Sequence, residues 1–290
     1  MWRRFSLTHV PFFDFYHMTM TTIEQMIQSS QVNAKDAKYL MAHVLNKDHH
    51  YVSANRDLVL SKEQMDRFSA LADKWAKGTP LEYLTNRSFF MGLDFYVDRQ
   101  VLIPRNETEQ LVEWVVNHVN QTKAQTVLDM CCGSGCILIS VLSLTPSTHG
   151  VGVDISKQAC EIAVTNAKKN QVDQRTKFVV SDLFAQVNTT FDVIVSNPPY
   201  ISTVDMLALE PSVADHEPHL ALHGGESGLV FYEEIAAQAK SYLNPTGAVF
   251  FEIGYNQGAQ VNDILKKNGY QNIEVKKDYF GHDRMVRAFL

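Results

Sequence analysis

The sequence lacks long apolar runs and has little cysteine, and both absences narrow what the protein can be. No stretch approaches the roughly 18 consecutive apolar residues of a membrane span, so we expect no membrane partner. Three of its four cysteines, Cys131, Cys132 and Cys136, share one short segment, with Cys160 apart. The second half of a zinc site is missing, so we expect no metal and no disulfide framework. A reducing cytoplasm is the expected compartment.

An excess of positive charge is also missing. The 290 residues carry 26 Lys and Arg against 32 Asp and Glu, a net charge of −6. Non-specific affinity for nucleic acid rests on neutralising phosphates, so this balance gives no bulk reason for direct binding to DNA or RNA. The hydrophobic fraction of 45% and the charged fraction of 20% are typical of a soluble globular protein. The length suits one large domain and a smaller one.

We expect no secretion signal at the beginning of the chain. Residues 1–17 lack both the apolar centre and the small-residue cleavage site of such a signal. Met18 and Met20 are alternative starts, and a short organellar leader is a weaker alternative. We treat residues 1–20 as a leader or an unstructured start.

Residues 21–85 are predicted to form an N-terminal helical domain. Apolar residues recur there at spacings of three and four, and Ser61 with Gln64 predicts a capped helix that runs to Trp75. The segment carries no obvious chemistry. Either it only packs against the rest of the protein or it grips a macromolecular substrate, and we favour substrate recognition.

Residues 86–104 are predicted to form a β-hairpin linker that turns near Met91 and Gly92. A short apolar strand over residues 101–103 is expected to stop at Pro104. Acidic residues then open a helix, because Glu107 and Glu109 suit the positive end of a helix dipole. We expect Arg105 to pair with one of these two acids.

Residues 105–290 alternate between strands and helices, which is typical of a parallel sheet covered by helices. The apolar runs predict seven strands in a Rossmann-like α/β fold. The predicted strands are 126–130, 150–154, 177–180, 191–196, 248–253, 273–276 and 285–290.

The fourth of these strands ends in Asn197-Pro198-Pro199-Tyr200. Two successive prolines fix φ and remove two backbone N–H donors, so their carbonyls remain as acceptors. The Asn side chain adds another acceptor, and the Tyr ring adds a flat apolar wall. Such a turn suits a planar group with an NH2, such as an amide or an exocyclic amine. An ordinary strand-to-loop stop is the alternative.

Three further groups fall at strand ends, where ligands of open α/β sheets bind. The small-residue turn at 131–135 allows a ligand to approach the backbone, with a helix N-terminus behind it. Asp154 ends the second strand and suits the two hydroxyls of a ribose, and Asp182 follows the third. Asp129 is expected to bond the amides of the turn and to orient a nucleoside-containing cofactor.

These motifs, in this order, resemble the class I S-adenosylmethionine-dependent methyltransferases that modify a planar nitrogen. The surrounding segments resemble the release-factor glutamine N5-methyltransferases, the HemK/PrmC family, from about Thr22 to the C-terminus. They are Pro-Leu-Glu-Tyr-Leu at 80–84, Phe-Met-Gly-Leu-Asp-Phe at 90–95, Leu-Ile-Pro-Arg-Asn-Glu-Thr-Glu at 102–109, Glu-Pro at 217–218, Ala-Leu at 221–222, Gly-Gly at 224–225, Glu-Ile-Gly at 252–254, Gln257 and Asp-Arg at 283–284.

The resemblance implies methyl transfer from S-adenosyl-L-methionine to the amide N5 of the Gly-Gly-Gln glutamine of peptide chain release factors, with S-adenosyl-L-homocysteine as product. It implies a class I methyltransferase sheet over residues 105–290. We expect a monomer without sequence-specific nucleic-acid binding. The expected catalytic residues are Asn197, Pro198, Pro199 and Tyr200, which also bind the substrate together with Arg105 and Glu107. The expected cofactor contacts are Asp129, Cys131, Cys132, Gly133, Ser134, Gly135, Asp154, Asp182, Leu183 and Asn197.

The chain departs from the family pattern at three positions. Cys131 stands where Gly is frequent, and a positive φ costs Cys more than Gly, so we expect a slight change of the turn. Leu183 stands where many members carry a large aromatic residue, which weakens the expected adenine contact. Asn86 replaces a frequent Gly in the hairpin region.

Four alternatives remain open at this point. A sister enzyme that methylates a glutamine of a large-subunit ribosomal protein shares the core motifs. An adenine-N6 methyltransferase would use the same turn, although the acidic balance argues against it. A cofactor-binding adaptor without catalysis is the third. A metal site at His216, His219 and His223 is the fourth, and we instead expect these residues in a mobile loop that covers the site.

Overall fold

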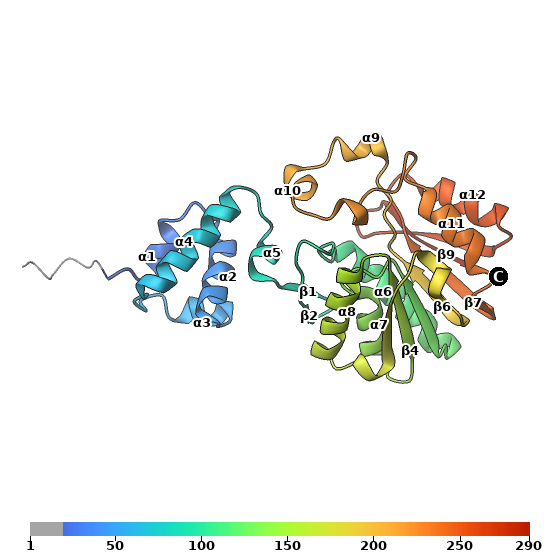
Figure 1. Ribbon diagram of the computed structural model, residues 1–290, viewed down its shortest axis with the longest axis horizontal. Helices are drawn as coiled ribbons and strands as arrows, with labels where there is room; N and C mark the ends of the chain where they lie inside the picture. Colours follow the sequence, from blue (N-terminus) through green and yellow to red (C-terminus); the bar gives the residue numbers. More distant parts are fainter. Residues whose placement is uncertain (1–19) are drawn as a thin grey trace, which may run out of the picture. The chain divides into compact units, whose positions relative to one another are not determined.

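The computed structural model describes residues 20–290 (Figure 1). The expected leader, residues 1–20, lies outside the described residues except for Met20. Two compact units follow, residues 20–77 and residues 78–290. The predicted domain boundaries at residues 85 and 104 stay predictions.

The first unit is helical, as predicted. Its capped helix is confirmed, because the Ser61 side chain accepts from the Gln64 amide and Gln64 bonds back to the Ser61 amide. The third helix was not predicted, since its six residues are too few to show a period; Asp48 caps it by accepting from the Tyr51 amide at 2.7 Å. The helices are α1 (Ile23–Gln28), α2 (Ala34–Leu45), α3 (His49–Ala54) and α4 (Lys62–Ala76).

The second unit begins with α5 (Leu81–Thr85) and the predicted hairpin, β1 (Ser88–Phe90) and β2 (Leu93–Phe95). The hairpin turns at Met91 and Gly92, both at positive φ. The strand predicted over residues 101–103 is wrong. This segment pairs with no strand, although Val101 and Ile103 are buried, so its apolar character reflects burial and not sheet pairing.

A seven-stranded sheet forms the centre of the second unit, which confirms the predicted fold class. The order is β5-β4-β3-β6-β7-β9-β8, and only β9 runs antiparallel to its neighbours β7 and β8. The strand order therefore reverses between β3 and β6: β4 and β5 lie on the β3 side, and β7, β9 and β8 lie on the β6 side. The strands are β3 (Thr126–Met130), β4 (His149–Asp154), β5 (Thr176–Val180), β6 (Phe191–Ser196), β7 (Leu243–Glu252), β8 (Gln271–Lys277) and β9 (Asp283–Phe289).

Helices cover both faces of this sheet (Figure 1). Val193 and Val195 of β6 pack with α6 (Asn106–Thr122), α7 (Cys136–Leu144) and α8 (Lys157–Lys169). Ile194 between them faces the other side, with α11 (Val230–Ala239) and α12 (Gly258–Lys267). All three side chains are fully buried, and each such burial contributes about 1.5–3 kcal/mol.

The remaining short helices lie in the connections of the second unit. They are η1 (Asp173–Arg175), η2 (Leu183–Gln186), α9 (Thr203–Met206), α10 (Pro211–Ala214) and η3 (His219–Ala221). Within residues 20–290, no helix combines the length and the apolar character that a membrane crossing requires.

One carboxylate joins three neighbouring strands at their amino ends. Asp192 of β6 accepts from the Gln125 and Thr126 amides of the β3 side at 2.8 and 3.0 Å, and from Asn244 Nδ2 of β7 at 2.6 Å. Burial raises the pKa of Asp192, but these hydrogen bonds outweigh burial and hold the pKa below its usual 3.8. The ionised carboxylate therefore stabilises the sheet above about pH 4, and the contribution is lost as pH falls through the lowered pKa.

We expect Asp192→Asn to lower the free energy of unfolding at pH 7 by about 1–2 kcal/mol, because an amide cannot accept all of these bonds. The measurement is urea unfolding at pH 7 and at pH 3. The gap between variant and wild type should shrink at pH 3. Asp173→Asn is the matched control, since the Asp173 carboxylate accepts one exposed bond from Gln174. Equal losses for the two variants would contradict the prediction.

Candidate active site

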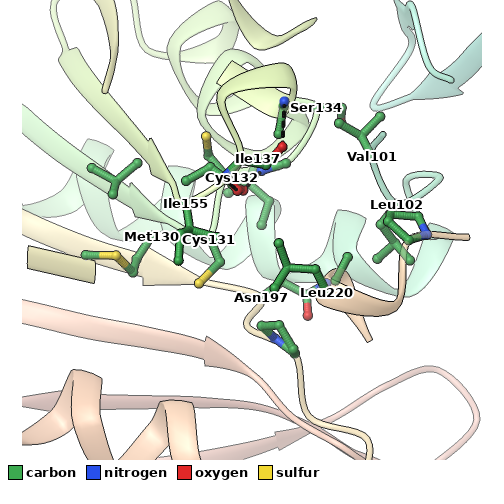
Figure 2. A pocket seen from close by; sticks show the side chains of 18 of the residues that line it. Val101, Leu102, Met130, Cys131, Cys132, Ser134, Ile137, Ile155, Asn197 and Leu220 are labelled. Atoms are coloured by element: carbon green, nitrogen blue, oxygen red, sulfur yellow. Dashed lines mark hydrogen bonds between the residues drawn. The ribbon is translucent and has the colours of Figure 1, made fainter. Parts of the chain in front are cut away.

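A cavity of about 340 Å³ opens at the carboxyl ends of the strands, where the strand order reverses between β3 and β6. Its volume is within the roughly 300–1,000 Å³ of small-molecule sites. Figure 2 shows side chains from separate segments around it, with Cys131, Cys132 and Ser134 after β3 and Asn197 after β6. Val101, Leu102 and Leu220 come from two other connections.

The turn at 131–135 has the strained backbone expected from the sequence. Cys131 has φ 60°, which confirms the left-handed conformation predicted for this non-glycine residue. Gly135, at φ 78°, could not be replaced without strain, because a Cβ there would lie 3.0 Å from Ile139 and 3.1 Å from Ala163. The Asn166 side chain of α8 stabilises the turn by donating a hydrogen bond to the Ser134 carbonyl at 2.9 Å.

Asp154 joins this turn to the end of β4. Its Oδ2 accepts from the Gly133 amide and its Oδ1 from the Ser156 amide, both at 2.9 Å. Burial raises the pKa of Asp154, while its backbone hydrogen bonds oppose the rise. A carboxylate oxygen accepts more than one bond, so each oxygen retains capacity for a hydroxyl from the cavity. This donor and acceptor set fits the diol of a ribose.

Asp129 lies beneath the turn and is fully buried. Its Oδ2 accepts from the Leu138 amide of α7 at 3.2 Å, so the expectation that it bonds the amides of the turn is wrong. Oδ1 is buried without a hydrogen-bond partner among residues 20–290. Burial raises the pKa of Asp129 to about 8, although the bond from Leu138 opposes this. Its expected contact with a cofactor stays a prediction.

Asn197 lines the cavity. Its Nδ2 donates to Thr108 Oγ1 at 3.3 Å, so Oδ1 takes no part in this hydrogen bond. The following residues are packed tightly, because a Cβ at Gly224 would lie 2.6 Å from the Pro199 carbonyl oxygen. Gln257 Nε2 donates to the Tyr200 carbonyl at 3.0 Å. The Asn-Pro-Pro-Tyr turn is therefore held from both sides.

Arg105 makes a different ion pair from the one predicted. It binds Glu217 Oε1 at 2.6 Å, whereas Glu109 accepts from the Met91 amide, so the predicted pairing with Glu107 or Glu109 is wrong. The partner lies 112 positions away and could not be read from local sequence. Burial raises the pKa of Glu217, and the nearby Arg105 charge opposes the rise. Arg105 also lines the cavity.

The segment with the three histidines covers part of the cavity, as predicted, because residues 218–221 line it. His219 is in this lining, while His216 bonds Arg99 at 2.9 Å and His223 bonds Thr203 at 2.9 Å. The mobility of the segment with the three histidines stays a prediction. Among residues 20–290, no three His, Cys, Asp or Glu side chains are grouped to hold a metal ion.

The structure brings most of the predicted site residues to one cavity. Those in its lining are Arg105, Cys131, Cys132, Gly133, Ser134, Asp154, Asp182, Leu183, Asn197 and Pro199. Glu107, Asp129, Gly135, Pro198 and Tyr200 are absent from the lining, and their roles toward ligands stay predictions.

Sequence reasoning missed the apolar part of the lining and two polar side chains behind Asn197. Thr108 and Glu252 are each 2% exposed, and neither residue was assigned a role from the sequence, although both stand in segments that resemble the family. The missed apolar residues include Val101, Leu102, Ile155, Leu220 and Phe231.

Two protein families match the chain, the PrmC N-terminal domain over residues 21–85 and the Methyltransferase small domain over residues 106–231. A release factor glutamine methyltransferase of Clostridium acetobutylicum is 35% identical over 257 residues, which are 88% of this chain and 90% of the relative. One of Clostridium botulinum is 36% identical over 256 residues, 87% of this chain and 90% of the relative.

Solved structures share the fold of the second unit. A methyltransferase from Pyrococcus furiosus is 19% identical with a TM-score of 0.50, over 68% of this chain and 89% of that one. SMU.776, solved in complex with SAH, is 13% identical with a TM-score of 0.50, over 69% of this chain and 54% of that one. At these identities the similarity establishes the fold alone.

We expect Cys131→Gly to stay within about 1 kcal/mol of wild type in urea unfolding, because relief of the positive φ offsets the added freedom of the unfolded chain. Cys131→Val should be less stable by roughly 1–2 kcal/mol, since a β-branched residue is strained at this φ. Cys136→Val, in the first turn of α7, is the matched control. A Cys131→Val variant as stable as Cys131→Gly would refute the strain.

Proposed function

The chain belongs to the release factor glutamine methyltransferase family, and we propose that it methylates the side-chain amide N5 of the Gly-Gly-Gln glutamine in peptide chain release factors. It is an S-adenosylmethionine-dependent protein methyltransferase. One observation supports the proposal at this site: Asn197 and Asp154 line the same cavity. Because the substrate is a translation factor, we place the reaction in the cytoplasm.

The residues of the cavity fit S-adenosylmethionine. The 131–135 turn leaves room beside its backbone, Asp154 suits the ribose hydroxyls, and Ile155 with Leu183 offers apolar contact to the adenine. Asp182 lines the same cavity and is proposed to contact the nucleoside. When bound, the cofactor supplies an electrophilic methyl group on a sulfonium and leaves as S-adenosyl-L-homocysteine.

The protein must orient a weak nucleophile, because the lone pair of an amide nitrogen is delocalised into its carbonyl. In the proposed complex, Asn197 Oδ1 and the Pro198 carbonyl accept the two N–H bonds of the glutamine. These acceptors fix the direction of the NH2 and stabilise the positive charge that develops on it. Tyr200 packs against the glutamine side chain, and the proton leaves to solvent after transfer.

The alternatives lose support at this point. Relatives over nearly the whole chain are named for release factors, which does not favour a ribosomal protein or adenine as the methyl acceptor. A non-catalytic adaptor would not require the held Asn-Pro-Pro-Tyr turn. Recognition of the release factor by residues 21–85, contacts of Arg105 and Glu107 with it, and a monomeric state belong to the proposal.

The first experiment measures methyl transfer from labelled S-adenosylmethionine to a purified release factor, a large-subunit ribosomal protein and duplex DNA. We expect label on the Gly-Gly-Gln glutamine, and a loss of about 10²–10³-fold in kcat for Asn197→Ala. Asn120→Ala, at an exposed position of α6, is the control and should transfer normally. Label only on the ribosomal protein or the DNA would overturn the substrate assignment.

A second experiment measures cofactor binding by calorimetry with S-adenosyl-L-homocysteine. Asp154→Asn should raise Kd by about 10–100-fold, because the neutral amide loses hydrogen bonds from the ribose to a charged acceptor. Asp173→Asn should bind as wild type does. An unchanged Kd for Asp154→Asn would remove Asp154 from the cofactor site.

A further inference from the structure

Glu252 is a buried carboxylate at the end of β7, and no step of the proposed reaction uses it. We propose that Glu252 is a positioning residue that acts on Asn197 chiefly through Thr108, and that it fixes which end of the Asn197 side-chain amide faces the cavity. This inference rests on the proposed function, because it concerns how Asn197 becomes an acceptor for the substrate NH2.

Strand register brings the three residues together. Ser196 of β6 pairs with Phe251 of β7, so Asn197 and Glu252 follow side by side at the carboxyl ends of adjacent parallel strands. Thr108 reaches them from the first turn of α6, which packs on β6 and β7. Thr108 and Glu252 are each only 2% exposed, so water does not compete for their hydrogen bonds.

The hydrogen bonds have a direction. Asn197 Nδ2 donates to Thr108 Oγ1 at 3.3 Å, so the Thr108 hydroxyl acts as acceptor there and its own hydrogen is free to donate elsewhere. Hydrogen bonding from Thr108 and Asn197 stabilises the carboxylate form of Glu252. An ionised Glu252 can only accept hydrogen bonds, so the Thr108 hydroxyl hydrogen points toward Glu252. Thr108 Oγ1 then accepts from Asn197 Nδ2, and Asn197 Oδ1 faces the cavity.

Protonation of Glu252 removes this constraint. A carboxylic acid can donate to Thr108, and Thr108 can then donate to Asn197, which turns the NH2 of Asn197 toward the cavity. Two NH2 groups would then face each other, and the substrate amide would lose an acceptor. Methyl transfer should therefore require ionised Glu252.

The surroundings place this change near neutral pH. Burial raises the pKa of Glu252 to about 7, while hydrogen bonding from Thr108 and the charge of Arg284 oppose the rise. Arg284 of β9 is engaged by Asp278 at 3.2 Å and by the Ile253 carbonyl, and no ion pair within residues 20–290 includes Glu252. Glu252 Oε2 is buried without a hydrogen-bond partner in the same range. The other titratable groups that face Glu252 are Glu107 of α6, Cys136 of α7, Tyr200 and Tyr232 of α11.

The kinetic test compares Glu252→Gln with wild type on the release factor between pH 5.5 and 9. We expect wild-type kcat to fall tenfold per pH unit below about pH 7. In Glu252→Gln, whose amide can donate or accept, kcat at pH 8.5 should be at least tenfold lower and the acidic limb should disappear. KM for the cofactor should change less than twofold. A variant with the wild-type kcat and pH profile would overturn the inference.

A second readout needs no substrate. In protein labelled with 15N at asparagine side chains, the Asn197 signal is assigned by its loss in Asn197→Ala. It should titrate with a midpoint near pH 7 in wild type and not in Glu252→Gln. A signal that does not titrate, or that titrates equally in both, would overturn the inference. An inactive wild type with the expected titration would instead refute the proposed function alone.

Two further variants separate positioning from packing. Thr108→Val keeps the shape and removes the hydroxyl, so it should lower kcat and abolish the acidic limb, as Glu252→Gln does. Thr108→Ser keeps the hydroxyl, so it should show the wild-type kcat and the wild-type acidic limb. If Glu252→Gln does not fold, this pair decides the question. Glu274→Gln on β8, whose carboxylate pairs with Arg287 at 2.6 Å, is the charge control and should behave as wild type. Equal behaviour of the Val and Ser variants would overturn the inference.

Discussion

The site depends on the register between three parallel strands. Met130 of β3, Ser196 of β6 and Phe251 of β7 form one row across the sheet, and the Ser196 hydroxyl donates to the Met130 carbonyl at 2.6 Å. The next residue on each strand is Cys131, Asn197 or Glu252. A shift of one residue would reverse the face to which each side chain points, so the same pairing holds the sheet together and assembles the site.

Two carboxylates are buried near the carboxyl ends of the strands, where burial disfavours their charged form. Asp129 and Glu252 are buried carboxylates whose pKa values burial raises, and each has an oxygen without a hydrogen-bond partner among residues 20–290. The opposite end differs, since the Asp192 carboxylate is fully engaged by backbone and side-chain donors and its pKa is lowered. Stability is therefore concentrated at the amino ends of the strands and chemistry at the carboxyl ends.

Local sequence predicted most of the fold, because strand and helix periodicity is itself local. The seven strands and the hairpin at Met91 needed only nearby residues, whereas the positive φ of Cys131 was expected from the family resemblance. The errors came from partners distant in sequence. Arg105 bonds a glutamate 112 positions away, and the buried 101–103 segment has the composition of a strand without a strand to pair with. Likewise, Thr108 and Glu252 acquire a role only through the fold.

In the proposed complex, the consecutive acceptors at Asn197 and Pro198 would govern selectivity as well as rate. Pro198 and Pro199 carry no N–H, so this part of the turn offers oxygens and no backbone donor to an incoming group. A glutamate carboxylate would meet only like partial charges there and be rejected, although it has nearly the shape of glutamine. The methylated product has one N–H where the substrate had two, so it leaves one acceptor unpaired. In the proposed reaction, the turn would thus favour release after a single modification.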